Sequence, residues 1–192
     1  MDVFRRHGGT LRTGDAIRQG IHPRTLYAMR DQGLLDTISR GVYRLASTAP
    51  IADPDLLAVA ARVPQGVLCL VSALAVHEIT TQIPHAVDIA LPPGAWAPDL
   101  KHPPIRIFRF SGRSMTEGIE SRSFDQFQLQ VFCAEKTLAD CFKFRNKIGL
   151  DIAIEALRLY RERRRANIAK ILEYADIDRV ANVMRPYLEF MT

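Results

Sequence analysis

Residues 13–45, TGDAIRQGIHPRTLYAMRDQGLLDTISRGVYRL, decide the fold of the N-terminal part of the chain. Thr13 is expected to cap a short helix, because its hydroxyl can accept a hydrogen bond from a backbone N–H that lacks a helical partner. Gly20 ends this helix without a steric penalty. Pro23 suits the first position of a second helix, which Gly33 then stops. The stretch therefore predicts two short helices joined by a tight turn.

Two short strand-like runs follow the second helix, at residues 35–38 and 42–45. The segment Ser39-Arg40-Gly41 joins them, and its glycine can take the positive φ that a tight hairpin turn requires. The order helix, turn, helix and hairpin with a basic tip is that of a winged helix-turn-helix. The sequence therefore predicts a DNA-binding head.

The second helix would be the recognition helix, the element that enters the major groove. Leu26 and Met29 share one face, so both are expected to pack inward. An exposed arginine near the N-terminal end can donate to a guanine edge, and a Thr or Ala methyl can meet a thymine methyl. Asp31 would repel phosphate and is expected either to pair with Arg30 or to lie clear of the DNA. The candidate DNA-binding residues are Thr13, Arg24, Thr25, Tyr27, Ala28, Arg30, Arg40 and Arg44.

The positive charge of the chain is concentrated in its N-terminal quarter. The 192 residues carry a net charge of +5, and residues 1–48 hold eight arginines against four acidic residues, a net charge of +4. Neutralising the phosphates of DNA requires such an excess of basic side chains. The expected recognition helix has an alternative interpretation: its polar side chains would then form only the solvated face of a small packing module.

Composition sets the class of protein. A hydrophobic fraction of 47% is normal for a globular chain. No apolar run approaches the roughly 20 residues that cross a bilayer, and the N-terminus lacks the apolar segment of a signal peptide. We therefore expect a cytoplasmic protein without a membrane partner. Its three cysteines, Cys69, Cys133 and Cys141, form no CxxC pair and are expected to be buried free thiols.

Residues 46–54 combine small residues with two prolines, which favours a domain boundary. The length suits two small domains. We expect a winged helix-turn-helix of residues 1–48, with its first helix before Thr13, and a larger mixed α+β domain of residues 53–192 that ends in a helical bundle. In the second domain the expected strands lie at residues 67–71, 86–91, 105–110, 119–124 and 128–132, and the expected helices at residues 55–63, 72–79 (capped by Ser72), 134–145, 150–164, 168–174 and 178–190.

Three stretches of the chain are distinctive when taken together. The first is the head, ending in Ser39-Arg40-Gly41-Val42-Tyr43. The second is SALAVHEITTQIPHAVDIALPPG, residues 72–94, and the third is AEKTLADCFKFRNKIGLDIAIEALRLYR, residues 134–161. In this order they resemble the AbiEi-type antitoxins of type IV toxin–antitoxin systems. The two longer stretches are far more specific than a lone helix-turn-helix.

This resemblance implies a division of labour. The winged head would bind double-stranded operator DNA and repress the protein's own operon, and the C-terminal domain would carry the antitoxic function. The implied toxin is nucleotidyltransferase-like and is countered without a stable complex. Catalytic residues, cofactors and metals are not expected. Two alternatives remain: a DNA-binding regulator without antitoxin activity, and a nucleotide-dependent enzyme in the C-terminal domain.

Charged residues around the third stretch suggest a surface used in antitoxicity. This candidate surface comprises Lys136, Asp140, Lys143, Arg145, Lys147, Arg158, Arg161 and Arg165. The first three share one helix side at i, i+4 and i+7, so a packing network between helices is the alternative, and a vestigial nucleotide pocket is another. No P-loop or GxGxxG motif accompanies them.

Arginines crowd the end of the long helix within this region, at positions 158, 161, 163, 164 and 165. Cations there favour the C-terminal end of the helix dipole, but five exceed what capping needs. A second contact with the DNA backbone and a contact with a second protomer on DNA are the alternatives. Ser72, His77 and Glu78 do not predict a hydrolase, because no GxSxG motif is present.

Overall fold

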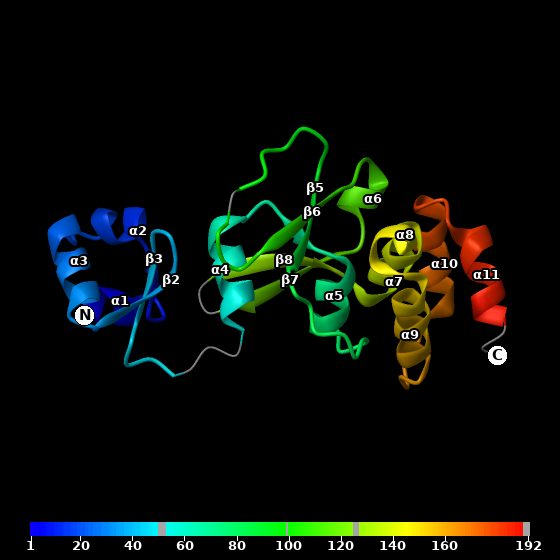
Figure 1. Cartoon of the computed structure of the whole chain (residues 1–192), viewed down its shortest axis with the longest axis horizontal. Coiled ribbons are helices and arrows are strands. Elements are labelled where there is room, and N and C mark those ends of the chain that lie inside the picture. Colours follow the sequence, from blue (N-terminus) through cyan, green and yellow to red (C-terminus); the bar gives the residue numbers. More distant parts are fainter. Residues whose placement is uncertain (50–52, 99, 125–126, 190–192) are drawn as a thin grey trace. The chain divides into compact units, whose positions relative to one another are not determined.

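The computed structural model describes residues 1–49, 53–98, 100–124 and 127–189, and it has the predicted α+β class, with helices and two sheets (Figure 1). The chain divides into two compact units. Unit 1 comprises Met1–Pro64, Lys101–Pro103 and Arg122–Leu129, and unit 2 comprises Gln65–Leu100, Pro104–Ser121 and Gln130–Thr192. Residues 50–52 of the expected interdomain link lie outside the described residues, and the division at residues 48 and 53 stays a prediction.

The head within unit 1 is a winged helix-turn-helix. Its elements are α1 (Asp2–Arg6), β1 (Thr10–Arg12), α2 (Thr13–Arg18), α3 (Pro23–Asp31), β2 (Leu35–Ser39) and β3 (Val42–Leu45). The strands form an antiparallel sheet in the order β1-β3-β2. A small core fills the space between sheet and helices, formed by Phe4, Leu11, Ala16, Leu26, Leu35, Tyr43 and Leu45. Unit 1 also contains α4 (Pro54–Arg62).

The start of the head differs from the sequence prediction in two ways. Residues 1–12 form a helix and also β1, because Gly8 and Gly9 adopt positive φ and turn the chain back to pair with β3. Thr13 is the first residue of α2, and the N-cap is Arg12, whose side chain makes no capping hydrogen bond. The Thr13 amide and hydroxyl both donate to the Gly41 carbonyl, at 2.8 and 3.3 Å. Thr13 therefore ties α2 to the turn of the wing.

Unit 2 is built on a mixed five-stranded sheet in the order β6-β5-β4-β8-β7. The strands are β4 (Val67–Leu68), β5 (Val87–Leu91), β6 (Ile105–Arg109), β7 (Ile119–Phe124) and β8 (Phe127–Phe132). Residues 122–124 of β7 and 127–129 of β8 belong to unit 1. β4 pairs antiparallel with β5 and parallel with β8, and β5 pairs parallel with β6. These strands confirm the expected positions except at β4.

The apolar run at residues 67–71 is strand only in its first half. Helix α5 (Leu70–Val76) begins inside the run, with Cys69 at its N-cap. Ser72 is therefore inside the helix and not its cap; its hydroxyl accepts from the Asp88 amide at 2.9 Å and ties α5 to β5. The error has a physical origin, since hydrophobicity alone does not separate a buried strand from a buried helix.

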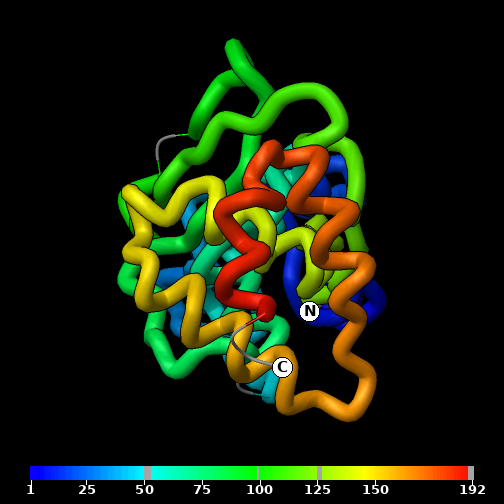
Figure 2. Tube along the Cα trace, turned by 90° about the vertical axis from the view of Figure 1, so that its right-hand side faces the viewer, coloured from blue at the N-terminus to red at the C-terminus, as the bar shows by residue number. Residues whose placement is uncertain are grey.

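The C-terminal helices form the predicted bundle (Figures 1 and 2). They are α7 (Ala134–Lys143), α8 (Arg145–Ile148), α9 (Leu150–Arg161), α10 (Ile168–Ile177) and α11 (Ala181–Glu189), and the short α6 (Arg113–Thr116) precedes β7. Helix α7 packs against α5, α9, α10 and α11, and so lies at the centre of the bundle. The last helix begins three residues later than expected, because Arg179 adopts a left-handed φ of 59° after α10; Phe190 of that expected helix lies outside the described residues.

The three cysteines are buried free thiols, as predicted. Burial raises the pKa of Cys69 and Cys141 well above the usual value, which keeps both in the unreactive thiol form. Across the ranges that the structure describes, no helix is long and apolar enough to cross a membrane.

Candidate functional sites

The exposed face of α3 carries the candidate base-reading residues. Leu26 is fully buried and Met29 packs against the head core, as the helix phase predicts. Arg24, Thr25, Tyr27 and Ala28 are all exposed, and Tyr27 retains 42% of its accessible surface. The N-cap of α3 is His22, whose Nδ1 accepts a hydrogen bond from the Arg24 amide at 3.2 Å. This cap was not predicted from the sequence, because Ser, Thr, Asp and Asn are the usual N-cap residues.

Ion pairing divides the eight arginines of the head into engaged and unengaged side chains. Arg5 pairs with Asp2 at 3.7 Å, Arg18 pairs with Asp15, and Arg30 pairs with Asp31 at 2.7 Å. The Arg30 pair is one of the two expected outcomes for Asp31. Among the residues that the structure describes, three arginines of the head are exposed and make no ion pair: Arg6, Arg24 and Arg40.

Two further arginines of the head are less exposed: Arg44 is buried and Arg12 is half-buried. Arg44 lies in β3 and is only 7% exposed, so it does not join the face formed by α3. The guanidinium of Arg12 lies over the ring of Phe127, with 5.0 Å to the ring centroid. Arg6, by contrast, was not predicted from the sequence as a DNA-binding residue. The pattern of ion pairs that leaves it unengaged depends on side-chain geometry, which the sequence does not show.

The wing presents Arg40 at the turn between β2 and β3. Gly41 adopts a φ of +77°, as the hairpin prediction requires, and a register shift lies between Thr37 and Ser39. The Arg62 guanidinium, from α4, donates to the Arg40 carbonyl at 3.3 Å. The backbone of the wing tip is therefore held while the Arg40 side chain stays exposed.

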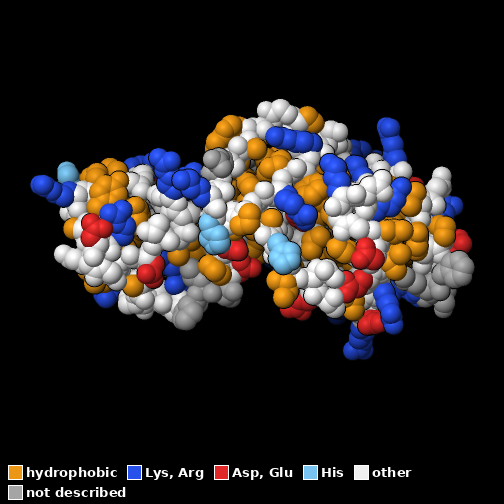
Figure 3. Space-filling view, in the orientation of Figure 1, with side chains coloured by type: hydrophobic (Ala, Val, Ile, Leu, Met, Phe, Trp, Pro, Cys, Tyr) orange, Lys and Arg blue, Asp and Glu red, His pale blue; other side chains and the backbone are white. Residues whose placement is uncertain are grey.

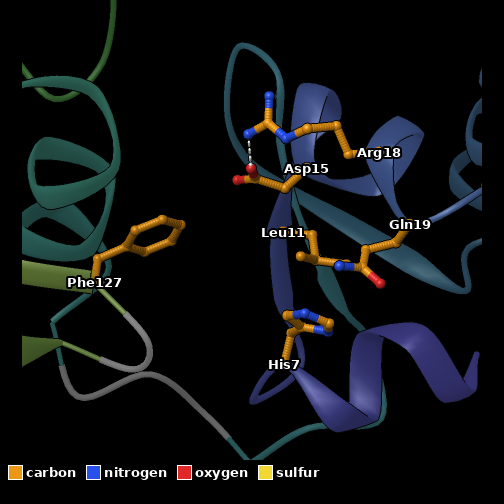
Figure 4. Close-up of a pocket in the computed structure, with 6 residues that line it drawn as sticks. All are labelled: His7, Leu11, Asp15, Arg18, Gln19 and Phe127. Atoms are coloured by element: carbon orange, nitrogen blue, oxygen red, sulfur yellow. Dashed lines mark hydrogen bonds and ion pairs between the residues drawn. The ribbon is translucent and has the colours of Figure 1, made fainter.

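A pocket of about 260 Å³ lies in unit 1 (Figure 4). It is lined by His7, Leu11, Asp15, Arg18, Gln19 and Phe127. Figure 4 shows Arg18 turned to Asp15, with the ion pair drawn as a dashed line. An acidic side chain therefore lines this pocket beside its arginine.

Unit 2 contains a cluster that we call the buried ion network: Ser114, Lys136, Asp140, Lys143 and Asp178. The Lys136 ammonium donates to Asp140, and to Asp178 at 3.3 Å. The Lys143 ammonium donates to Asp178 at 3.0 Å and to the Ser114 hydroxyl at 2.8 Å, and that hydroxyl donates to Asp178. These contacts tie α6, α7 and the end of α10 together.

The two carboxyl groups of the network are affected in opposite directions. Burial raises the pKa of Asp140 well above its usual value, and its Oδ2 is buried without a hydrogen bond. For Asp178, burial acts upward, but hydrogen bonds and the charge of Lys136 outweigh it and lower the pKa. The Lys136 ammonium also lies 4.7 Å from the centroid of the Phe132 ring. Asp178 is therefore the carboxylate that balances both lysines.

The network corrects one part of the expected antitoxicity surface. Lys136 and Asp140 are fully buried, with 0% of their surface exposed, so they cannot belong to an exposed interface. The helix spacing that placed them on one side was right, but that side faces α10 and the core. Their placement agrees with the alternative interpretation, a packing network between helices.

The remaining residues of that surface differ in how free they are. Arg145 is half-buried and donates to the Phe142 carbonyl at 2.8 Å, whereas Lys147 and Arg165 are exposed. Arg158 lies 3.9 Å from Glu162, and Arg161 is half-buried. The neighbouring Arg163 donates to the His77 carbonyl and so has a structural contact. Basic side chains lie beside hydrophobic ones on the face of unit 2 that is drawn in Figure 3.

The side chains of Ser72 and His77 both lie against backbone groups. Ser72 hydrogen-bonds to the backbone of residues 86 and 88, and His77 Nε2 lies 2.7 Å from the Phe132 carbonyl. The two side chains are thus engaged separately with backbone groups. Within the described ranges, no group of three His, Cys, Asp or Glu side chains could hold a metal ion.

Comparisons with known proteins found a family match to the head and a solved structure with a similar fold. Residues 1–46 match a family model described as "Transcriptional regulator, AbiEi antitoxin", which confirms the resemblance to AbiEi-type antitoxins at the N-terminus. The crystal structure of the RV2827C protein from Mycobacterium tuberculosis is similar over 94% of this chain and 76% of that chain, with a TM-score of 0.53 and 16% identity. At this identity the likeness shows the fold alone. No curated protein matches the sequence.

Proposed function

We propose that this AbiEi-type regulator binds double-stranded operator DNA through its head, represses its own operon, and serves as the antitoxin of a type IV toxin–antitoxin system. The family match of residues 1–46 supports the general role of transcriptional regulator and antitoxin. One observation carries the DNA-binding part: a winged helix-turn-helix whose second helix exposes Arg24, Thr25, Tyr27 and Ala28.

The geometry of α3 suits the major groove. A groove about 12 Å wide admits one α-helix, and the N-terminal residues of a recognition helix contact the base edges. Arg24 is the second residue of α3, near the end of the helix that contacts base edges. Its guanidinium would donate two hydrogen bonds to O6 and N7 of a guanine. The methyl groups of Thr25 and Ala28 would meet thymine methyls, and Tyr27 would reach the sugar-phosphate backbone.

Phosphate contacts are assigned to the unengaged arginines. Arg40 at the wing tip would contact the backbone or the minor groove, and Arg6 supplies another exposed cation without an ion pair in the described structure. Each neutralised phosphate contributes about −0.9 to the slope of log K against log salt concentration. Operator binding should therefore weaken steeply as salt is raised.

The test is fluorescence anisotropy of the full chain with DNA from upstream of its own gene. Arg24→Ala should cost about 1–3 kcal/mol of binding free energy and relax specificity, and Arg40→Ala should weaken all sequences alike and reduce the salt slope by about one. Arg5→Ala is the matched control, because that arginine is exposed but paired with Asp2. Equal affinity of wild type, Arg24→Ala and Arg40→Ala would contradict the proposal.

Antitoxicity is assigned to residues 53–192, acting in the cytoplasm on a nucleotidyltransferase-like toxin encoded beside this gene, without a stable complex. Lys147, Arg158 and Arg165 are the exposed members of the candidate surface. We expect Arg24→Ala to lose repression but to rescue growth when expressed from an independent promoter with the toxin. The double variant Arg158→Ala, Arg165→Ala should show the reverse.

Two results would change this assignment. Loss of rescue in Arg24→Ala, with full rescue by the double variant, would make repression the whole of the antitoxin effect. Failure of the wild-type protein to rescue growth, with operator binding intact, would leave a transcriptional regulator without antitoxin activity.

A further inference from the structure

A pocket of about 230 Å³ in unit 2 shares no residue with the head or with the buried ion network. Three segments line it: residues 82–86 after α5, Arg106 on β6, and the α8–α9 region from Lys147 to Ile152. The first and third segments belong to residues 72–94 and 134–161, the two long stretches singled out in the sequence. The fold thus brings both stretches to one cavity that the proposed DNA binding does not use.

The pocket contains an arginine whose orientation is fixed. Arg106 donates through Nε and Nη2 to the two carboxylate oxygens of Asp88, at 2.7 and 2.9 Å. Asp88 is fully buried and also accepts the Val71 amide at 3.2 Å. Arg106 remains 47% exposed and has three N–H groups beyond this pair. A preoriented guanidinium loses little freedom when it binds an anion.

A second cation, Lys147, lines the same pocket. The Arg106 guanidinium and the Lys147 ammonium are 5.7 and 5.9 Å from the centroid of the same ring, that of Phe108. Lys147 is exposed and forms no ion pair with any residue that the structure describes. His85 also lines the pocket, and none of the described lining residues is acidic. The polar side of the pocket is therefore suited to a phosphate group.

The other lining residues of the pocket are mainly aliphatic, and we call them its aliphatic side. It is formed by Val71, Ile83, Pro84, Ala86, Ile148 and Ile152. Ile83 is 82% exposed, which leaves an apolar surface that a flat ligand would cover. Gln82 adds a side-chain amide, which carries both a donor and an acceptor. That combination can hydrogen-bond to the edge of a heterocyclic base.

We propose that this pocket binds a nucleoside 5′-monophosphate. Its phosphate lies between Arg106 and Lys147, and its base packs on Ile83 and the aliphatic side, with its edge at Gln82. The volume of about 230 Å³ is below the about 300–1,000 Å³ of pockets that enclose drug-sized ligands, so the pocket would hold only part of a mononucleotide and has no room for a dinucleotide. This site is independent of operator binding by the head.

Isothermal titration of the full chain tests the proposal, with the four ribonucleoside 5′-monophosphates, adenosine and inorganic phosphate as probes. We expect at least one monophosphate to bind at least tenfold more tightly than adenosine and than inorganic phosphate. Lys147→Ala should weaken monophosphate binding about tenfold. Arg185→Ala is the matched control, because it removes one exposed positive charge outside the pocket.

A second variant separates the two sides of the ligand. Ile83→Asn should weaken binding of the monophosphate but leave that of inorganic phosphate unchanged, since it changes only the aliphatic side. No binding of any monophosphate at millimolar concentration, or equal loss in Lys147→Ala and Arg185→Ala, would overturn the site. Equal affinity for inorganic phosphate and every monophosphate would overturn the assignment of a nucleotide. Operator binding by Lys147→Ala should match that of wild type.

Discussion

The face of α3 and the buried ion network of unit 2 both concentrate charge on short helices, but they hold it in opposite ways. On α3, Arg24 is exposed and has no acidic partner among the described residues. In the network, Lys136 is fully buried between Asp140 and Asp178. An unpaired exposed cation is available to a ligand, whereas a buried one is committed to the fold. The same residue types therefore predict binding in one place and packing in the other.

Removing the central carboxylate of the network should have the largest effect on folding. Asp178→Ala leaves Lys136 buried with Asp140 alone and deprives Lys143 of its carboxylate partner. Breaking a buried pair in this way costs about 3–5 kcal/mol. Urea denaturation should show that loss for Asp178→Ala, and almost none for Asp176→Ala, which changes an exposed aspartate two residues earlier, in the last turn of α10. Equal stability of the two variants would end the contrast with α3.

A glycine beside the network should give the next largest effect. Gly118 has a φ of +71°, and a Cβ placed there would lie 2.9 Å from the Cβ of Lys136. Gly94 has a similar φ of +74°, but nothing lies within 4 Å of the corresponding position. Both Gly→Ala variants should lose about 1–2 kcal/mol from the left-handed backbone, and Gly118→Ala should lose more because Lys136 must shift. Thermal unfolding of the pair isolates this packing cost; equal losses would show that Lys136 has room to move.

The pH dependence of stability should sharpen the role of Asp140. Its folded-state pKa is raised by burial, so it favours folding most below its unfolded pKa of about 3.9, and this contribution is lost as pH rises through the folded value. Asp140→Asn cannot ionise. The variant should therefore gain stability relative to wild type as pH is raised above about 4.

This pH experiment has a built-in comparison in Asp178. The pKa of that carboxyl is lowered, so its contribution is present above the unfolded pKa and is lost as pH falls through the folded value. Asp178→Asn should therefore lose more stability, relative to wild type, near neutral pH than in acid. The same pH trend in both Asn variants would show that the two carboxyl groups do not differ.

The sequence predicted the head more accurately than the charged cluster. Gly20, Pro23, Gly33 and Gly41 set helix ends and a turn through local backbone preferences, and the structure has each boundary within about a residue of its expected place. Strand β1 was missed, because its pairing with β3 is a long-range contact that local propensity does not encode.

The network needed information that no single helix contains. The i, i+4 spacing correctly placed Lys136 and Asp140 on one side of α7. Asp178, which pairs with Lys136 on this buried side, lies 38 residues after Asp140 in the sequence, at the end of another helix. The pocket at Arg106 was missed for the same reason, since its members are brought together only by the sheet and the bundle.

Truncating the exposed arginines should have the smallest effect on folding. Arg24 and Arg40 make no ion pair through their side chains within the described part of the chain, and exposed substitutions away from special features usually change stability by no more than about 0.5 kcal/mol. Urea denaturation of Arg24→Ala and Arg40→Ala should therefore match wild type within that margin. Any loss of DNA affinity in these variants is then a loss of contact and not of folding. A destabilisation comparable to that of Asp178→Ala would mean that the arginines support the head structurally, and the distinction between an available and a committed cation would fail.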